Sequence, residues 1–446
     1  MDLTEPQAGS DVGDSTTKAV PTGEPGAYLI KGTKCFISGG EQDITENIVH
    51  LALARIEGAA PGTRGLSLFV VPKYLPDENG KPGTWNDITC AGIEHKLGLK
   101  GSSTCVISYG DEGKCRGFLL GSPPGQDGTA QGMAQMFKMM NEERLMSGLS
   151  GCALAASAYH SAVQYCNERI QGRPTASPKT GRCAIIRHED VKRMLLYQKA
   201  HIEAFRAMVL QTFWWVDIEN NSADAELHRQ ARVFLEINTP IVKAWCSDTA
   251  LLCISEALQC YGGYGFSEEY PAAQLYRDAR IYPIWEGTNY IQSLDLIGRK
   301  MTMKKGEVFL AWLKHIQEFA EANKNAAGFE KEFEILLATL GKYAGILKTL
   351  QGLLAVPGMP QLYATRVLHA TGKLWGAKLL LEMALIAQKK MDELGKDHFD
   401  CAFYQGKVAS ARFFARNILP EIGALAEVLK TGDSTALEAQ EAIFLA

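Results

Sequence analysis

The pattern of apolar and polar positions changes once along the chain, near residue 125. Before that point, short apolar and β-branched runs alternate with Gly, Pro and Asp at turn positions; the runs cover residues 48–56, 66–74, 105–109 and 117–120. Residues 27–38 are expected to form two short strands joined by a Gly-Thr turn. Closely spaced short strands predict an antiparallel β-barrel or sandwich.

After that point the apolar residues recur at helical spacing. Long helices are expected over residues 128–171, 188–219 and 223–261, with Pro240 bending or dividing the last one, and a fourth follows Thr288. Four long helices joined by short loops predict a bundle. Further helices are expected at 306–323, 330–353, 359–392 and 402–430.

These patterns predict an α+β multi-domain fold. We expect a β domain over residues 1–125, a four-helix bundle over 126–303 and an additional helical domain over 304–446. From residue 306 to the end there are 15 Lys plus Arg and 16 Asp plus Glu, so the additional domain is nearly neutral.

The charge of the chain limits its possible partners, and its cysteine content indicates its compartment. A net charge of −4 gives no reason to expect nucleic acid or an anionic membrane as a partner, and no apolar run has the length of a membrane span. The 11 cysteines include no CxxC pair, which favours free thiols in a reducing compartment, and we expect the cytoplasm. Neither a zinc motif nor a Walker A loop nor a GxGxxG after a strand is present, so no metal is expected.

One carboxylate has the surroundings of a general base. Glu286 stands between the apolar pair Ile284–Trp285 and Gly287, just before a helix that Thr288 is placed to cap. The helix dipole favours its ionised form, whereas apolar neighbours partly desolvate it. On these residues alone, Glu286 is either a poised base or an acid that only stabilises the helix.

Five separated motifs resemble those of one family. They are Thr4-Glu-Pro-Gln-Ala-Gly-Ser-Asp11, Lys34-Cys-Phe-Ile-Ser-Gly-Gly40, Asn141-Glu-Glu-Arg144, Gln259-Cys-Tyr-Gly-Gly-Tyr-Gly-Phe266 and Tyr282-Pro-Ile-Trp-Glu-Gly-Thr288. Over residues 1–302 the chain resembles the acyl-CoA dehydrogenases. It is most similar to their larger subgroup, which includes 3-methylmercaptopropionyl-CoA dehydrogenases and has an additional C-terminal helical domain.

The resemblance implies bound FAD and an acyl-CoA substrate. In the family, the carboxylate of the Glu-Gly-Thr motif, here Glu286, removes the α proton while the β hydride goes to the flavin N5, which gives a trans-2-enoyl-CoA. The backbone N–H of the base and a flavin ribityl hydroxyl stabilise the enolate oxygen. A minority of the family places its base where Glu143 stands, and here Glu143 is interpreted as a partner of Arg144 or a surface acid.

The resemblance also assigns binding residues. Phe36 stands where most members have an aromatic residue over one flavin face, and the FAD contacts as a set are Thr4, Phe36, Ser38, Arg169, Gln171, Gln259, Gly262, Gly263 and Thr288. Some of these reach the FAD of a neighbouring subunit, which implies a homodimer or homotetramer. The expected substrate contacts are Ser10, Asn141, Arg144 and Gly287.

Other functions remain open from the sequence. The family implies electron-transfer flavoprotein as the electron acceptor, and the near alternative is an acyl-CoA oxidase that uses O₂. A DNA-associated, damage-response relative would need a basic additional domain, which the near-neutral count argues against. A non-catalytic helical scaffold and an inactive truncated fragment are the remaining alternatives.

Family members have a helical N-terminal domain ahead of the Thr-Glu-Pro segment, whereas Thr4 lies at the start of this chain. Because that domain lines part of the acyl pocket, we expect this chain alone to bind FAD weakly and to turn over slowly or not at all. Flavin content and dye-coupled acyl-CoA oxidation, measured on this chain and on a version extended upstream, check this expectation. Equal activity of the two would contradict it.

Overall fold

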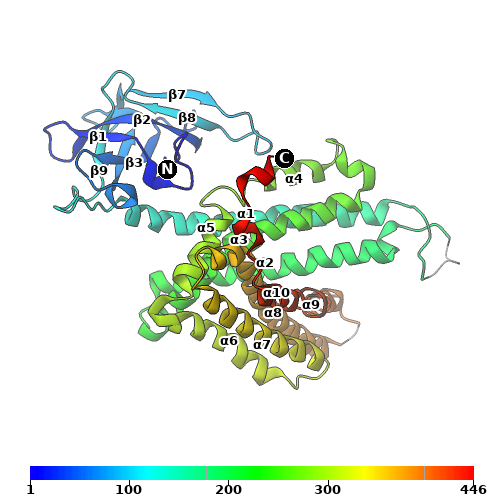
Figure 1. The fold of residues 1–446 in the computed structure, drawn as a ribbon. Coiled ribbons are helices and arrows are strands. Elements are labelled where there is room, and N and C mark those ends of the chain that lie inside the picture. Colours follow the sequence, from blue (N-terminus) through cyan, green and yellow to red (C-terminus); the bar gives the residue numbers. More distant parts are fainter. Residues whose placement is uncertain (177–178, 180, 396, 446) are drawn as a thin grey trace. The chain divides into compact units, whose positions relative to one another are not determined.

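The computed structural model describes residues 1–176, 179, 181–395 and 397–445. The chain divides into two units, residues 1–142 and 143–446. Figure 1 shows strands in the first unit and helices in the second. The boundary falls inside helix α1 (Gly132–Glu168), close to the predicted change from β to α pattern.

The first unit is a β domain whose main sheet closes on itself. Strand β1 pairs with β3 in parallel and with β2 in antiparallel, so the order β1-β3-β4-β9-β2 forms a ring that β8 and β7 extend. The strands are β1 (Lys18–Pro21), β2 (Ala27–Ser38), β3 (Val49–Ile56), β4 (Leu66–Pro72), β5 (Tyr74–Pro76), β6 (Pro82–Trp85), β7 (Ile88–Ile93), β8 (Thr104–Tyr109) and β9 (Arg116–Leu119). This barrel-like sheet confirms the predicted β architecture.

The prediction of two short strands within 27–38 is wrong. Strand β2 runs without a break through Gly32, and its first half pairs with β1 and β9 while its second half pairs with β8. A Cβ at Gly32 would lie 2.3 Å from Thr17 Oγ1. Glycine is therefore needed here for a close backbone approach rather than for a turn.

The second unit is helical, and most of its elements match the predicted helices closely. The fourth long helix of the bundle, predicted after Thr288, is instead the seven-residue α5 (Asn289–Asp295) followed by a π-helical segment. Pro240 lies inside α3, which is one continuous element, and the segment predicted as 402–430 is interrupted at Pro420. The α-helices after α1 are α2 (Glu189–Asn221), α3 (Ala225–Cys260), α4 (Pro271–Ala279), α5 (Asn289–Asp295), α6 (Glu307–Asn323), α7 (Glu330–Leu353), α8 (Met359–Leu394), α9 (Cys401–Phe413), α10 (Glu421–Thr431) and α11 (Thr435–Glu438). Five-residue π-helical segments follow α5 and α9.

The bundle helices and the C-terminal helices share one core. Helix α8 packs against α2, α3 and α5. A Cβ at Gly372 of α8 would lie 2.6 Å from the Trp245 ring of α3, so the indole lies directly on the α8 backbone. Trp312 of α6 donates a 3.1 Å hydrogen bond to Asn238 Oδ1 of α3. This packing places 126–303 and 304–446 in contact, and the division of the chain into three domains stays a prediction.

The α+β fold class is confirmed by this arrangement of a β domain and a helical unit. All 11 cysteines are free thiols, as the absence of CxxC pairs led us to expect. No helix among the described residues is both long and apolar enough to cross a membrane.

Candidate active site

Glu286 lies in a strained turn between α4 and α5. Its φ of 53° is in the left-handed region, which is uncommon for a residue other than glycine, and Gly287 follows with φ 78°. Thr288 caps α5, because its Oγ1 accepts a 3.4 Å hydrogen bond from Ile291 N, as predicted. Backbone strain of this kind is concentrated at functional sites, where the surrounding structure holds it in place.

Burial raises the pKa of the Glu286 carboxyl, and the nearby Glu143 charge raises it further, whereas Lys243 and Arg144 oppose the shift. Glu143 itself is exposed, while Arg144, one residue on along α1, is buried with 7 % of its surface exposed. A carboxyl with a raised pKa has a stronger affinity for a proton. That property suits a general base near neutral pH.

Two further features of the Glu286 turn affect how it can bind and activate a substrate. Within the described residues, the backbone N–H of Glu286 donates no hydrogen bond, so it is available to a substrate oxygen. A Cβ at Gly287 would lie 3.0 Å from Gln292 Nε2 and 3.6 Å from Arg144 Nη2. Gly287 therefore permits both the left-handed backbone and the close approach of these two polar side chains.

In the first unit, the predicted flavin contacts lie around a bulge in β2. The pairing of β2 with β8 shifts register between Lys34 and Ile37, and Phe36 has φ 59° with 63 % of its surface exposed. Cys35 N donates a 2.9 Å hydrogen bond to Thr4 O, so the Thr4 segment lies beside the bulge. The bulge turns Phe36 out of the core, leaving its ring free to cover a planar ligand.

A buried ion pair fixes this segment. Glu5 Oε1 lies 2.8 Å from Lys34 Nζ, and both side chains are almost inaccessible. Glu5 also accepts hydrogen bonds from the backbone N–H and hydroxyl groups of Thr16 and Thr17. Lys34 Nζ donates in addition to Leu3 O at 3.0 Å. The Glu of the Thr-Glu-Pro motif is therefore structural, and it holds Thr4 next to β2.

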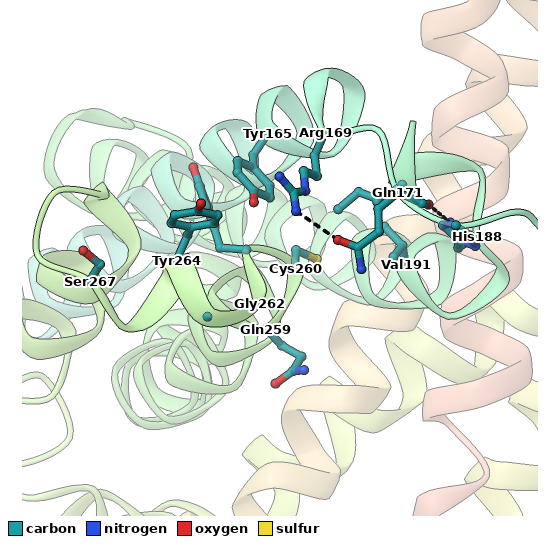
Figure 2. Close-up of a pocket in the computed structure, with 14 residues that line it drawn as sticks. Tyr165, Arg169, Gln171, His188, Val191, Gln259, Cys260, Gly262, Tyr264 and Ser267 are labelled. Atoms are coloured by element: carbon teal, nitrogen blue, oxygen red, sulfur yellow. Dashed lines mark hydrogen bonds between the residues drawn. The ribbon is translucent and has the colours of Figure 1, made fainter. Parts of the chain in front are cut away.

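Within the second unit, five predicted FAD contacts line one cavity of about 830 Å³. Figure 2 shows Arg169 and Gln171 on one side and the segment after α3 on the other. Arg169 Nη2 donates to Gln171 Oε1 at 3.1 Å, and its guanidinium lies 5.9 Å from the centre of the Tyr264 ring. The predicted residues in this lining are Arg169, Gln171, Gln259, Gly262 and Gly263.

The cavity has the chemistry that a dinucleotide diphosphate requires. Gly262 has φ 60°, and at both Gly262 and Gly263 the position of a Cβ has nothing within 4 Å. Two exposed glycines leave the backbone open to close approach, and Arg169 supplies a positive charge opposite them. The aromatic rings of Tyr165 and Tyr264 provide apolar walls. These residues therefore fit the diphosphate and adenosine part of FAD.

The remaining predicted contacts are less informative. Ser10 and Asn141 are exposed residues of the first unit, and their roles as substrate contacts stay predictions. Sequence reasoning missed Lys243, Asn289 and Gln292, which are buried around the Glu286 turn. Asn289 and Gln292 stand within six residues of Glu286, and their polarity in an otherwise apolar helix pattern was the available signal. Lys243 gave no signal of its own.

Three family models match consecutive parts of the chain. They are described as acyl-CoA dehydrogenase, middle domain, for residues 1–111; acyl-CoA dehydrogenase, C-terminal domain, for residues 130–302; and acetyl-CoA dehydrogenase C-terminal like, for residues 312–440. The last model matches the additional helical region, as the resemblance to the larger subgroup implied.

Named relatives agree with these matches. The chain is 45 % identical over 446 residues to a butyryl-CoA dehydrogenase of Syntrophomonas wolfei, covering 100 % of this chain and 73 % of that protein. It is 39 % identical to the 3-methylmercaptopropionyl-CoA dehydrogenase of Ruegeria pomeroyi, covering 97 % and 72 %. An acyl-CoA dehydrogenase of Bacillus anthracis, solved in complex with FAD, has the same fold, with a TM-score of 0.72 at 22 % identity over 96 % of this chain and 68 % of that one. The chain belongs to the acyl-CoA dehydrogenase family.

Proposed function

We propose that this chain catalyses the FAD-dependent α,β-dehydrogenation of an acyl-CoA thioester to a trans-2-enoyl-CoA, with Glu286 as the base that removes the α proton. The observation that carries the assignment is the Glu286 turn. It presents a carboxylate of raised pKa together with its own free backbone N–H. The α C–H of a thioester is a very weak acid, so its removal needs a base and a donor to the carbonyl oxygen at the same place.

Different residues of the chain have different roles in the proposed reaction. Glu286 takes the α proton onto a carboxylate oxygen, and its backbone N–H donates to the thioester carbonyl oxygen as negative charge develops there. FAD, when bound, accepts the β hydride. We assign Phe36, Thr4 and Ser38 to the flavin ring and Thr288 to the FAD at the turn.

The remaining assignments concern the diphosphate, the substrate and the partner protein. Arg169 and the two cavity glycines would hold the FAD diphosphate, and Arg144, Gly287, Ser10 and Asn141 are proposed substrate contacts. We further propose electron-transfer flavoprotein as the electron acceptor and a homodimer or homotetramer as the assembly. The free cysteines suit a reducing compartment, and we propose the cytoplasm.

The test is anaerobic mixing of the flavin-loaded protein with acyl-CoA thioesters of graded chain length, including 3-methylmercaptopropionyl-CoA. We expect bleaching of the oxidised flavin absorbance and a product two hydrogens lighter than the substrate. Hydrogen peroxide release in air, without another acceptor, would instead identify an oxidase. Failure of every thioester to bleach the flavin, both in this chain and in the version extended upstream, would contradict the proposal.

Arg169 gives a prediction for cofactor binding. Replacing Arg169 with alanine removes the positive charge beside Gly262 and Gly263, so we expect FAD to bind about tenfold or more weakly, since a charge-assisted hydrogen bond contributes about 1.5–3 kcal/mol. Quenching of flavin fluorescence on titration into the apoprotein measures the change. Arg229→Ala, on the exposed surface of α3, is the matched control and should bind FAD as the unaltered chain does. Equal affinity of the two variants would remove Arg169 from the site.

A further inference from the structure

We propose that Lys243 is a positioning residue for the catalytic base: its buried ammonium holds Asn289, which fixes the strained Glu286 turn, and its charge acts on the carboxylate. The inference rests on the proposed function, because it takes Glu286 as the base. Lys243 lies on α3, 43 positions before Glu286 (286 − 243).

Lys243 and Asn289 form a buried polar link between α3 and α5. Lys243 is 0 % exposed, and its Nζ donates a 2.7 Å hydrogen bond to Asn289 Oδ1. Asn289 Nδ2 in turn donates to Ala244 O at 3.2 Å and to Ser247 Oγ at 3.0 Å. The amide of Asn289 is thus held at both of its ends by one turn of α3. Its side chain has little freedom to rotate.

Asn289 also closes the loop that carries the base. Its backbone N donates a 3.0 Å hydrogen bond to Pro283 O, so the residues between them, including Glu286, form a closed turn. Gln292, one helical turn further, donates from Nε2 to Gly287 O at 3.2 Å. A turn with two consecutive left-handed residues persists only when its surroundings fix it. The link to Lys243 is a support for this turn that comes from another helix, α3.

The charges around this link explain why the ammonium affects the base. No carboxylate among the described residues lies within ion-pair distance of Lys243. The charged groups that act on it are Asp248 of its own helix, Arg144 of α1 and Glu286 itself. Glu143 of α1 also acts on Glu286 and raises its pKa. Below its own pKa, Lys243 is therefore a cation that favours the ionised form of the base without forming a direct ion pair with it.

The same lysine lowers the stability of the fold over part of the pH range. Burial lowers the pKa of Lys243 to about 7, against a usual value of 10.5. Between these values the unfolded chain binds the proton and the folded chain does not, so stability rises with pH across that window and is lower below it. A methionine at this position would avoid that penalty. A residue that weakens the fold near neutral pH is better explained by a role in the site than by packing.

The experiment compares Lys243→Met with Lys243→Gln, which keeps a donor for Asn289 but has no charge. Lys378→Met, a buried lysine of α8 beside Trp375 and Phe319, is the matched control. We expect Lys243→Met to slow flavin bleaching by acyl-CoA about 10–100-fold, because small displacements of a catalytic group have effects of this size. The pH at which the rate of Lys243→Met rises should also be higher, because this variant lacks the cation that favours ionised Glu286.

Hydrogen–deuterium exchange of the flavin-free protein supplies a readout that does not depend on turnover. Peptides within residues 283–292 should exchange faster in Lys243→Met and remain protected in Lys243→Gln, whereas the pH dependence should shift in both. The thermal midpoint of Lys243→Met at pH 6 should not fall. Lys378→Met should alter neither the exchange of this segment nor the pH dependence.

The possible failures are distinguishable. If neither the unaltered chain nor the version extended upstream shows bleaching with any acyl-CoA, the proposed function fails, and exchange of the 283–292 segment still tests the link. If the unaltered chain is bleached but Lys243→Met has the same rate, pH dependence and exchange, Lys243 has no positioning role. A normal pH dependence in Lys243→Gln would overturn the part of the proposal that concerns charge.

Discussion

Replacing Glu286 with glutamine is expected to slow flavin bleaching by acyl-CoA about 10²–10⁴-fold, the usual contribution of a positioned general base. The amide has nearly the same size and cannot accept the α proton. The backbone N–H of residue 286 and the cap from Thr288 do not depend on the carboxylate, so the turn should persist. Rapid mixing under anaerobic conditions measures the rate, and the flavin absorbance before mixing shows whether the cofactor has been retained.

Glu143→Gln is the matched control for this experiment. Glu143 is exposed and its charge raises the pKa of Glu286, so its removal should shift the rise of rate with pH to lower pH and leave the plateau nearly unchanged. A large loss of rate in Glu143→Gln with full activity in Glu286→Gln would exchange the two roles. That outcome would make Glu143 the base, as in the minority of the family that lacks an acid at the Glu286 position.

The sequence allowed the helices to be predicted well because the pattern that defines them is local. Apolar residues at three- to four-residue spacing determine which face is buried, and caps such as Thr288 mark where a helix begins. The predicted helix over 188–219 therefore matches α2 to within two residues at each end. The continuous strand β2 was missed because the function of Gly32 depends on Thr17, fifteen positions away, and on how β1 lies against it.

Only part of the candidate site could be predicted from the sequence, again because only local patterns can be recognised there. Glu286 and the cavity glycines were predicted because each lies in a short motif, whereas Arg169 was assigned only by its match to the family. The left-handed backbone at Glu286 could not be read from a glutamate, and only Gly287 beside it suggested a tight turn. Lys243 lies in a helix, and the side chain of a helical lysine is usually exposed to solvent. Its burial follows from the packing of α3 against α5, which no local pattern specifies.

A second large effect is expected at the buried pair of Glu5 and Lys34 in the β domain. Burial by itself would raise the pKa of Glu5, but Lys34 and the threonine donors outweigh it and lower that pKa to about 2. For Lys34 the balance is reversed, because burial lowers its pKa in spite of Glu5. The net gain from the pair is therefore smaller than the Glu5 shift alone suggests. The loss on removing one partner is large all the same, because a charge is then buried without compensation.

We expect Glu5→Gln to lower the stability of the first unit by about 3–5 kcal/mol, since it leaves the Lys34 ammonium unpaired and turns an amide N–H₂ toward groups that are themselves donors. Hydrogen exchange of peptides from residues 1–131 in increasing urea measures the β domain separately from the α-helices. Glu24→Gln, which removes an exposed ion pair with Arg116, is the control and should cost less than about 1 kcal/mol. Equal stability of the two variants would contradict the argument.

The pH dependence of the same variant follows from the sign of the Glu5 shift. The folded pKa of about 2 lies below the usual value of 4.5, so between these values the unfolded chain binds a proton that the folded chain does not. The stabilisation is present above about pH 4.5 and is lost as the pH falls toward 2, and the difference between Glu5→Gln and the unaltered chain should shrink over that range.

The same variant should also affect flavin binding. Lys34 Nζ donates a hydrogen bond to Leu3 O, and Cys35 N donates one to Thr4 O, so the segment that Glu5→Gln loosens is the one that carries Thr4 and Phe36. Flavin retention should therefore fall together with stability in Glu5→Gln, and it should stay unchanged in Glu24→Gln.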